Sequence, residues 1–342
     1  MAEIALFREQ ELAFRTQYAE LKERVAAAGS ILPGTPGTLV RRAGTGYSYW
    51  YRVYYPAPGK QSEDIVCKDG DTDALQAVRE GIAFSAWVSA QVSSLRKLGF
   101  QIADKATARV LVELHNRGAF EAGLVLVGTL GYMAWLNELG AMAVSARTLD
   151  IDLARRQRLK LAAPLSFLTT MQATGLPFAS VPALPAKGAS TSVKLPGVQG
   201  LRVDILAPNS TLGATVRVPE LDWAAQGIPH YDYLLKGPEP GAMLAGGHCI
   251  PVRLPQAARL AWHKLYSSAN RRGFPEKAAK DRRQGLVLAA VLAEADPQAL
   301  ARAFKAAPKA MAKSIVPLHG RLAKELSAQP SLQAILRECL NR

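Results

Sequence analysis

The sequence has few cysteines and no long hydrophobic run. Its three cysteines, Cys67, Cys249 and Cys339, are scattered, and no two of them form a C-x-x-C pair. This pattern predicts neither a disulfide framework nor a zinc site, so we expect free thiols in a reducing compartment. No run of about eighteen uninterrupted apolar residues occurs, and residues 1–29 lack the apolar core of a secretory signal. We therefore expect a soluble, cytoplasmic protein with no membrane partner.

Acidic residues are scarce relative to basic ones. The chain carries 42 Lys and Arg against 28 Asp and Glu, a formal net charge of +14. Such an excess favours a polyanionic partner such as a nucleoside triphosphate, RNA or DNA. Disorder is not expected, because 49% of the residues are hydrophobic and a chain of 342 residues can bury a substantial core. The positive charge is concentrated in Arg155–Lys160, Arg271–Arg283 and Lys305–Lys324. The last cluster is equally typical of a solvated surface.

Residues 1–100 are predicted to combine helices with an aromatic hairpin. Helical periodicity covers residues 3–28 and ends in the turn-rich sequence LPGTPG. Alternating Tyr, Trp and Val over 47–55, followed by a Pro-Gly turn and a second short run, predict a β-hairpin. Residues 72–96 and 104–117 are then expected to be helical. The hairpin aromatics either stack on nucleic acid or pack the strands on neighbouring helices, and we favour packing. They are Tyr47, Tyr49, Trp50, Tyr51, Tyr54 and Tyr55.

Residues 101–252 alternate predicted strands and helices, and residues 253–342 are predicted to form a helical domain. The apolar run 123–128 is too short for a helix and is predicted to be a buried strand, followed by a helix from Thr129 to Glu138. Further strands are predicted over 148–154 and 201–206, and shorter strands and turns over 211–252. Between the first two of these strands we expect a helical piece at 164–174 and a Pro/Gly/Ser-rich loop at 175–199.

Two aspartates on the strand 148–154 point to metal chemistry. Side chains alternate along a strand, so Asp150 and Asp152 share one face, with Cα atoms about 6.6–6.8 Å apart. Two carboxylates on one face are unfavourable unless a cation neutralises them, and Mg²⁺ is bound in this way together with substrate phosphates. Asp204 lies on the strand 201–206 and could supply a third carboxylate. A D-x-D pair alone also fits a solvated edge strand.

The glycine that ends the apolar strand adds a second element. Gly128 allows close backbone approach, and the helix that follows presents free N–H groups that attract phosphate, with Thr129 expected to cap it. The order strand, Gly-Thr, helix, D-x-D strand and Asp strand is much more specific than any of its parts. With two metal ions, such a carboxylate triad can activate an attacking hydroxyl and stabilise a leaving pyrophosphate.

In this order of motifs the sequence resembles the DNA polymerase β-type nucleotidyltransferase superfamily. Gly128-Thr129, the D-h-[DE]-h motif at 150–153 and Asp204 match its signature. More narrowly, residues 127–154 and 254–285 resemble uncharacterised bacterial nucleotidyltransferase-fold proteins, with a looser similarity to abortive-infection nucleotidyltransferase toxins. The resemblance implies an α+β fold in which a mixed sheet with helices carries the site, plus the C-terminal helical domain and the N-terminal helix and β-hairpin extension. Thr129 in place of Ser or Gly, and a long interval before Asp150, depart from the usual pattern.

The resemblance also implies cationic help from the helical domain. Helices that follow the catalytic sheet in such proteins bring a lysine toward the triphosphate, which makes Lys264 the first candidate and Lys280 the second. The alternative is a solvent-facing basic helix. His263 is expected to pack rather than act as a base, and His248 with Cys249 is too isolated for a metal site.

Two functions remain open on the sequence alone. The first is a Mg²⁺-dependent enzyme that moves a nucleoside monophosphate from an NTP to a hydroxyl of RNA, protein or a small molecule, in the setting of a toxin or phage-defence protein with a cognate antitoxin. The second is an inactive nucleic-acid-binding or regulatory protein on the same scaffold, because a fold alone does not fix function. Retention of all three carboxylates favours the enzyme, since an inactive protein has no physical reason to keep buried like charges.

Overall fold

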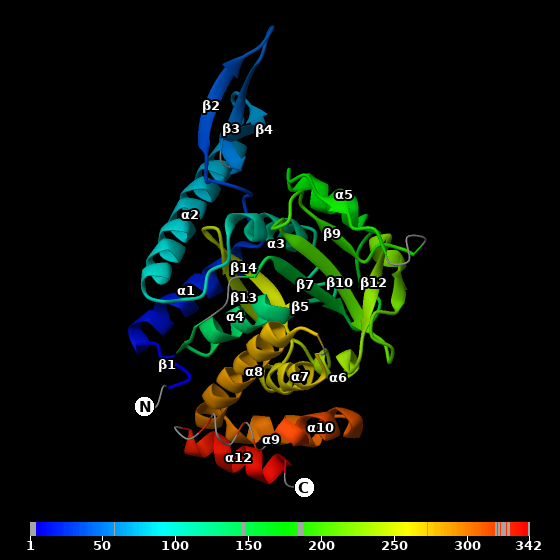
Figure 1. Ribbon diagram of the computed structural model, residues 1–342. Helices are drawn as coiled ribbons and strands as arrows, with labels where there is room; N and C mark the ends of the chain where they lie inside the picture. The colour runs from blue at the N-terminus through cyan, green and yellow to red at the C-terminus, as the bar shows by residue number, and fades with distance from the viewer. Residues whose placement is uncertain are drawn as a thin grey trace.

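The computed structural model describes residues 5–57, 59–144, 148–183, 188–271, 273–318, 320, 322, 326 and 329–340. A mixed sheet lies at the centre, a helical layer covers one end of the molecule, and a three-stranded sheet projects from the opposite end (Figure 1). The mixed α/β architecture agrees with the expected α+β class. No helix within the described part of the chain is long and apolar enough to span a membrane.

The N-terminal helix is shorter than predicted. α1 spans Leu12–Ala28, and the short strand β1, Arg8–Glu9, precedes it. The helix expected over 3–28 is therefore wrong for residues 5–11, and residues 3 and 4 lie outside the described residues. The cause is a tertiary contact, because β1 pairs antiparallel with β6, Ala141–Met142, and the Gln10 amide donates to the Gly140 carbonyl. These backbone groups therefore form hydrogen bonds between strands and cannot form the first turn of a helix.

The predicted aromatic hairpin is a three-stranded antiparallel sheet, which corrects the expected hairpin extension. Its strands are β2, Thr38–Ala43, β3, Ser48–Ala57, and β4, Lys60–Lys68. The missed strand β2 follows the turn-rich segment and pairs with β3 along its whole length. The packing interpretation holds for Tyr54, which is 8% exposed, but is wrong for Tyr47, Tyr49 and Tyr55, which are 57%, 36% and 50% exposed.

The two helices after this sheet are confirmed. α2 spans Thr72–Lys97 and α3 spans Lys105–Asn116. Each begins with an aspartate cap, because the Asp71 carboxylate accepts from the Ala74 amide and Asp104 accepts from the Thr107 amide. With α1, these helices pack on the strand β14, His248–Leu254, which comes much later in the chain. A separate small core joins α1 and α2 to the hairpin that β14 forms with β13, Glu239–Ala245.

The central sheet has the strand order β11-β12-β10-β7-β5, with β9 and β8 added beside β10. β7 and β12 run parallel to β10, whereas β5 is antiparallel to β7, and β9 is antiparallel to β10. The expected strands at 123–128, 148–154 and 201–206 are confirmed, and the segment expected to be a loop contributes β8 and β9. The strands are β5 Leu124–Leu126, β7 Asp150–Arg155, β8 Ala179–Ser180, β9 Ser192–Lys194, β10 Arg202–Pro208, β11 Thr215–Val218 and β12 Trp223–Ile228.

Helices and a second hairpin complete this region. α4 spans Gly128–Glu138 and is buried along almost its whole length, from Thr129 to Asn137. α5 covers Phe167–Ala173, η1 covers Pro219–Leu221, and α6 covers Tyr231–Leu234. β13, Glu239–Ala245, and β14, His248–Leu254, form a hairpin that packs against α4 and α3.

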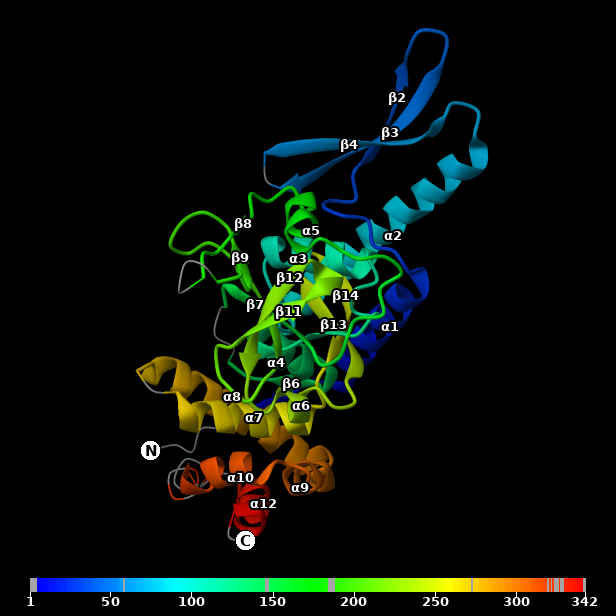
Figure 2. The same ribbon diagram turned by 90° about the vertical axis from the view of Figure 1, so that its right-hand side faces the viewer.

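The chain after β14 is helical, as predicted. α7 and α8 are the most closely packed helix pair, and α9, α10 and α12 lie beneath them (Figures 1 and 2). Their bounds are α7 Ala257–Asn270, α8 Pro275–Ala295, α9 Pro297–Lys305, α10 Lys309–Ile315, η2 Val316–Leu318 and α12 Pro330–Leu340.

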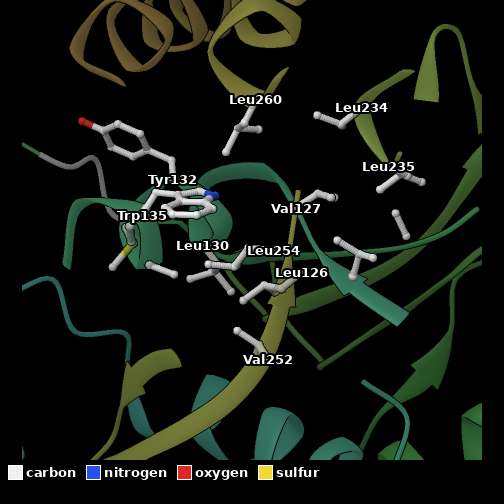
Figure 3. Close-up of a cluster of buried hydrophobic side chains, with 14 of the residues drawn as sticks. Leu126, Val127, Leu130, Tyr132, Trp135, Leu234, Leu235, Val252, Leu254 and Leu260 are labelled. Carbon is white, nitrogen blue, oxygen red and sulfur yellow. The ribbon is translucent and has the colours of Figure 1, made fainter. Parts of the chain in front are cut away.

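A continuous core fixes the helical layer to the sheet. Leu130 and Trp135 of α4 lie among Leu254 of β14 and Leu260 of α7 (Figure 3). The Trp135 indole N–H also donates to the Pro255 carbonyl over 2.8 Å. Burying such large side chains contributes about 1.5–3 kcal/mol each, so α4 is held firmly between the sheet and α7.

Candidate functional site

The three predicted carboxylates lie on two adjacent parallel strands. β7 and β10 are in register, with Asp152 opposite Asp204 and Asp150 opposite Arg202. Neighbouring strands are about 4.8 Å apart, so Asp204 stands beside Asp152 on the same face of the sheet. The alternate residues Ile151 and Val203 are fully buried on the other face. The sheet therefore brings the three aspartates together from segments that are distant in the sequence.

Gly128 lies directly against this pair of strands. Its φ is +65°, and a Cβ added there would lie 1.9 Å from Oδ2 of Asp152. Only glycine meets both conditions without a shift, because L-residues rarely adopt this φ and the space is already filled. The Val127 amide also donates to the backbone carbonyl of Asp152, which fixes the start of α4 beside the carboxylate.

The structure changes the expected position of Thr129. α4 begins at Gly128, its N-cap is Val127, and no side chain caps it, so the expectation that Thr129 caps the helix is wrong. Thr129 is instead inside the first turn and 4% exposed. An uncapped helix N-terminus leaves backbone N–H groups for an anion, which agrees with a phosphate site at this glycine.

Electrostatics single out Asp152. Burial raises the pKa of its carboxyl to about 6, the negative charges of Asp204 and Asp150 add to the rise, and Lys264 and Lys280 oppose it. A carboxyl in this setting strongly favours a neutralising cation. The same interactions show that both candidate lysines lie within electrostatic range of the aspartates.

The carboxylate of Asp204 is engaged on one side. Its Oδ1 accepts from Nε of Arg202 over 2.8 Å and from the Ser192 hydroxyl, and Nη2 of Arg202 also donates to that hydroxyl. Among the described residues, no group of three or more His, Cys, Asp or Glu side chains forms a ready-made metal cage. The donor set nevertheless fits Mg²⁺, because this ion commonly takes one or two carboxylates and completes its shell with water and substrate phosphate.

Lys264 is committed to a buried ion pair. Its side chain is 9% exposed, and Nζ lies 2.8 Å from Oδ1 of Asp281, whose Oδ2 accepts from Nε of Arg271 over 2.6 Å. The two cations hold the pKa of Asp281 below its ordinary value despite burial. Lys264 thus joins α7 to α8 and acts on Asp152 through its field.

Lys280 is less constrained. It lies one turn from the start of α8 and is partly exposed, and within the described chain no hydrogen bond or ion pair ties its ammonium to another side chain. Burial lowers its pKa first, Lys264 adds to this effect, and Asp281, Asp150 and Asp152 oppose it. Of the two lysines, Lys280 therefore has the ammonium that is available to a phosphate.

The comparisons with known proteins agree with this geometry. A family model described as nucleotidyltransferase matches residues 105–309. The chain belongs to the nucleotidyltransferase family. The match covers more than half of the 342 residues and includes the α4 glycine, both aspartate strands and both candidate lysines. A search of curated proteins gave no match. The prediction of a nucleotidyltransferase is thus confirmed, while the polymerase β type and the narrower resemblances to uncharacterised bacterial proteins and to abortive-infection toxins stay predictions.

Ser192 and Tyr231 also lie near the aspartates, and neither was identified from the sequence. Ser192 lies in a segment expected to be a loop, and only the pairing of β9 with β10 brings it to Asp204. Tyr231 is 7% exposed, and burial, together with the charges of Asp152 and Asp281, raises the pKa of its hydroxyl. Arg202 was visible as part of the same strand motif, two residues before Asp204 and therefore on the same face.

His263 does not enter the site as a base. His263 is 6% exposed, and burial lowers its pKa to about 4, so its ring is neutral at pH 7. The ring packs edge-on to Tyr231 at a centroid distance of 5.2 Å. His263 is therefore a packing residue, as predicted.

Proposed function

We propose that this nucleotidyltransferase moves a nucleoside monophosphate from an NTP to a hydroxyl of RNA, protein or a small molecule. The observation that carries the proposal is the parallel register of β7 and β10, which pairs Asp152 with Asp204 directly beside Gly128. Three aspartates on one face, a glycine at an uncapped helix start and a nearby free ammonium form a set suited to phosphate chemistry.

Each group has a role in this proposal. The backbone N–H groups at the start of α4 bind the phosphates of the NTP, with Gly128 leaving room for close approach. Lys280 offsets the charge of the leaving pyrophosphate. Asp204, oriented by Arg202 and Ser192, accepts a hydrogen bond from the acceptor hydroxyl and takes its proton as attack proceeds.

Asp150 and Asp152 are the residues that would hold Mg²⁺. Their fit rests on the position of two carboxylates on one face of β7 and on the raised pKa of Asp152, which burial and the neighbouring charges of Asp204 and Asp150 cause. Bound ions would neutralise phosphate charge and align the displacement. Lys264, fixed by Asp281, adds a permanent positive field behind this pair.

The test uses the full chain with each labelled NTP in turn, Mg²⁺ and cell extract as the source of acceptors. Label transfer should be lost in Asp150→Asn and Asp152→Asn and retained in Asp73→Asn, an exposed aspartate on α2. Digesting the product with nuclease or protease then separates RNA, protein and small-molecule acceptors. Absence of transfer from all four NTPs would contradict the proposal and favour an inactive binding protein on this scaffold.

A further inference from the structure

A cavity lies away from the aspartates, where the three-stranded sheet joins the rest of the molecule. We call it the root cavity. Its volume is about 260 Å³, and it lies between the segment that leads into β2, helices α2 and α3, and the turn from β13 to β14. Figures 1 and 2 both show β2, β3 and β4 projecting from this junction. The cavity therefore opens beside an extension that has a large exposed surface.

The root cavity is lined by cations without acidic neighbours. Lys105 and Arg109, on the first turns of α3, both line it, and none of the described residues around it is Asp or Glu. Nη2 of Arg109 donates to the Thr174 carbonyl, but its Nη1 is buried and has no hydrogen-bond partner within the described chain. The cavity is thus lined by the cationic side chains of Lys105 and Arg109, and these favour an anionic ligand that accepts hydrogen bonds.

Neutral donors and bare backbone complete the lining. Ser85 and Ser89 of α2 supply hydroxyl groups, and His248 supplies an imidazole whose pKa is lowered mainly by burial. The turn from β13 to β14 comes close to the helices because it is formed by glycine, and a Cβ on Gly247 would lie 3.0 Å from the Ser89 hydroxyl oxygen. Two cations, hydroxyl groups and open backbone in one small cavity are a set suited to a phosphate group.

Exposed aromatic side chains occur along the strand that contributes Tyr55 to this cavity. Tyr55 lines the root cavity and is 50% exposed, and Tyr47 and Tyr49 are exposed on the same strand and the turn before it. The ammonium of Lys68 lies 4.0 Å from the Tyr47 ring centroid, so positive charge accompanies the aromatic rings. Exposed rings with interspersed cations suit stacked bases and their phosphates.

We propose that the root cavity binds one phosphate of a single-stranded nucleic acid, whose neighbouring bases stack on the exposed tyrosines of the three-stranded sheet. The cavity is smaller than the roughly 300–1,000 Å³ of pockets that enclose drug-sized ligands, so it takes a phosphate with part of its sugar. The absence of acidic lining among the described residues and the net charge of +14 favour an anionic partner over a basic or apolar one, and the exposed tyrosine rings favour a nucleic acid over an acidic protein. The inference is independent of nucleotidyl transfer, because binding needs neither NTP nor Mg²⁺.

The test is fluorescence anisotropy of a short labelled single-stranded RNA, and of DNA of the same sequence, with the full chain and no NTP. Lys105→Ala should weaken binding about fivefold near 0.1 M salt. It should also reduce the slope of the logarithm of the binding constant against the logarithm of the salt concentration by about 0.7, which is the contribution of one phosphate contact to a single strand. Tyr55→Ala should weaken binding about five- to hundredfold, while Tyr55→Phe keeps the ring and the affinity. Both side chains are exposed, so these variants should fold.

Lys309→Ala, an equal change of charge on the C-terminal helices, is the matched control and should leave binding unchanged. Equal affinities and salt slopes for wild type, Lys105→Ala and Tyr55→Ala would overturn the proposal. A loss confined to Lys309→Ala would overturn it in favour of the C-terminal basic cluster. A third outcome would also overturn the proposal: inorganic phosphate stabilises the wild type but not Lys105→Ala against thermal unfolding, and neither protein binds the oligonucleotide. The ligand of the cavity would then be a free phosphate ion.

Discussion

Replacing Gly128 by alanine should disrupt the site more than it disrupts the fold. Placing an L-residue at φ +65° costs about 1–2 kcal/mol. The new Cβ would also lie 1.9 Å from Oδ2 of Asp152, so that carboxylate must rotate away at a further cost of about 0.5–1.5 kcal/mol. We expect Gly128→Ala to lower the free energy of unfolding by about 2–3 kcal/mol. The displaced carboxylate should abolish label transfer and Mg²⁺-dependent NTP binding.

Gly118 provides a matched control for this prediction. Its φ is +68°, and no atom lies within 4 Å of a Cβ built there. Gly118→Ala therefore carries the same backbone strain without the clash, and we expect a loss of about 1–2 kcal/mol with NTP binding intact. Urea unfolding measures the free energies, and displacement of a fluorescent ATP analogue measures binding. Equal destabilisation of the two variants, with NTP binding retained by Gly128→Ala, would refute the placement of Asp152 against this glycine.

Three other perturbations follow from the site. Burial raises the pKa of Asp152 to about 6, so the folded state binds the carboxyl proton more tightly than the unfolded state does. Without divalent ions, the free energy of unfolding should therefore fall by about 1–3 kcal/mol as the pH rises from 4 through 6. Asp152→Asn should flatten this dependence in urea titrations. Lys264→Met should lower the free energy of unfolding by about 3 kcal/mol, because the Asp281 carboxylate stays buried without this partner. The double variant Lys264→Met/Asp281→Leu should recover most of that loss. A double variant as unstable as the single one would contradict the pairing. Lys280→Ala should weaken NTP binding about tenfold in the same displacement assay, whereas exposed Lys277→Ala on the same helix should not.

Local periodicity was sufficient to predict the strands that carry the aspartates. The alternation in TLDIDLA places Asp150 and Asp152 on one face whatever the partner strand is, and the structure has that strand as β7. Gly128 was identifiable only together with the two aspartate strands, because the order of these motifs is much more specific than a glycine between a strand and a helix. The class of chemistry thus followed from short segments of the chain.

Contacts between distant segments could not be predicted in the same way. No local pattern shows that Ser192 lies beside Asp204, because that depends on how β9 pairs with β10. The role of Lys264 was likewise hidden, since its partner Asp281 lies on the next helix and could equally have faced solvent. The strand β2 was missed because the turn-rich sequence before it was treated as a linker, although its partner β3 was correctly identified.

The parallel pairing of β7 with β10 has a consequence for how the protein becomes active during synthesis. Parallel strands cannot be joined by a tight turn, and here α5, β8 and β9 intervene between them. Such non-local pairings form slowly and only after both strands have been made. Asp152 therefore gains its neighbour Asp204 late, and Lys264 gains Asp281 later still, when α8 has emerged from the ribosome. A nascent or truncated chain that ends before α8 should be inert, so we expect activity only from chains that extend at least through α8.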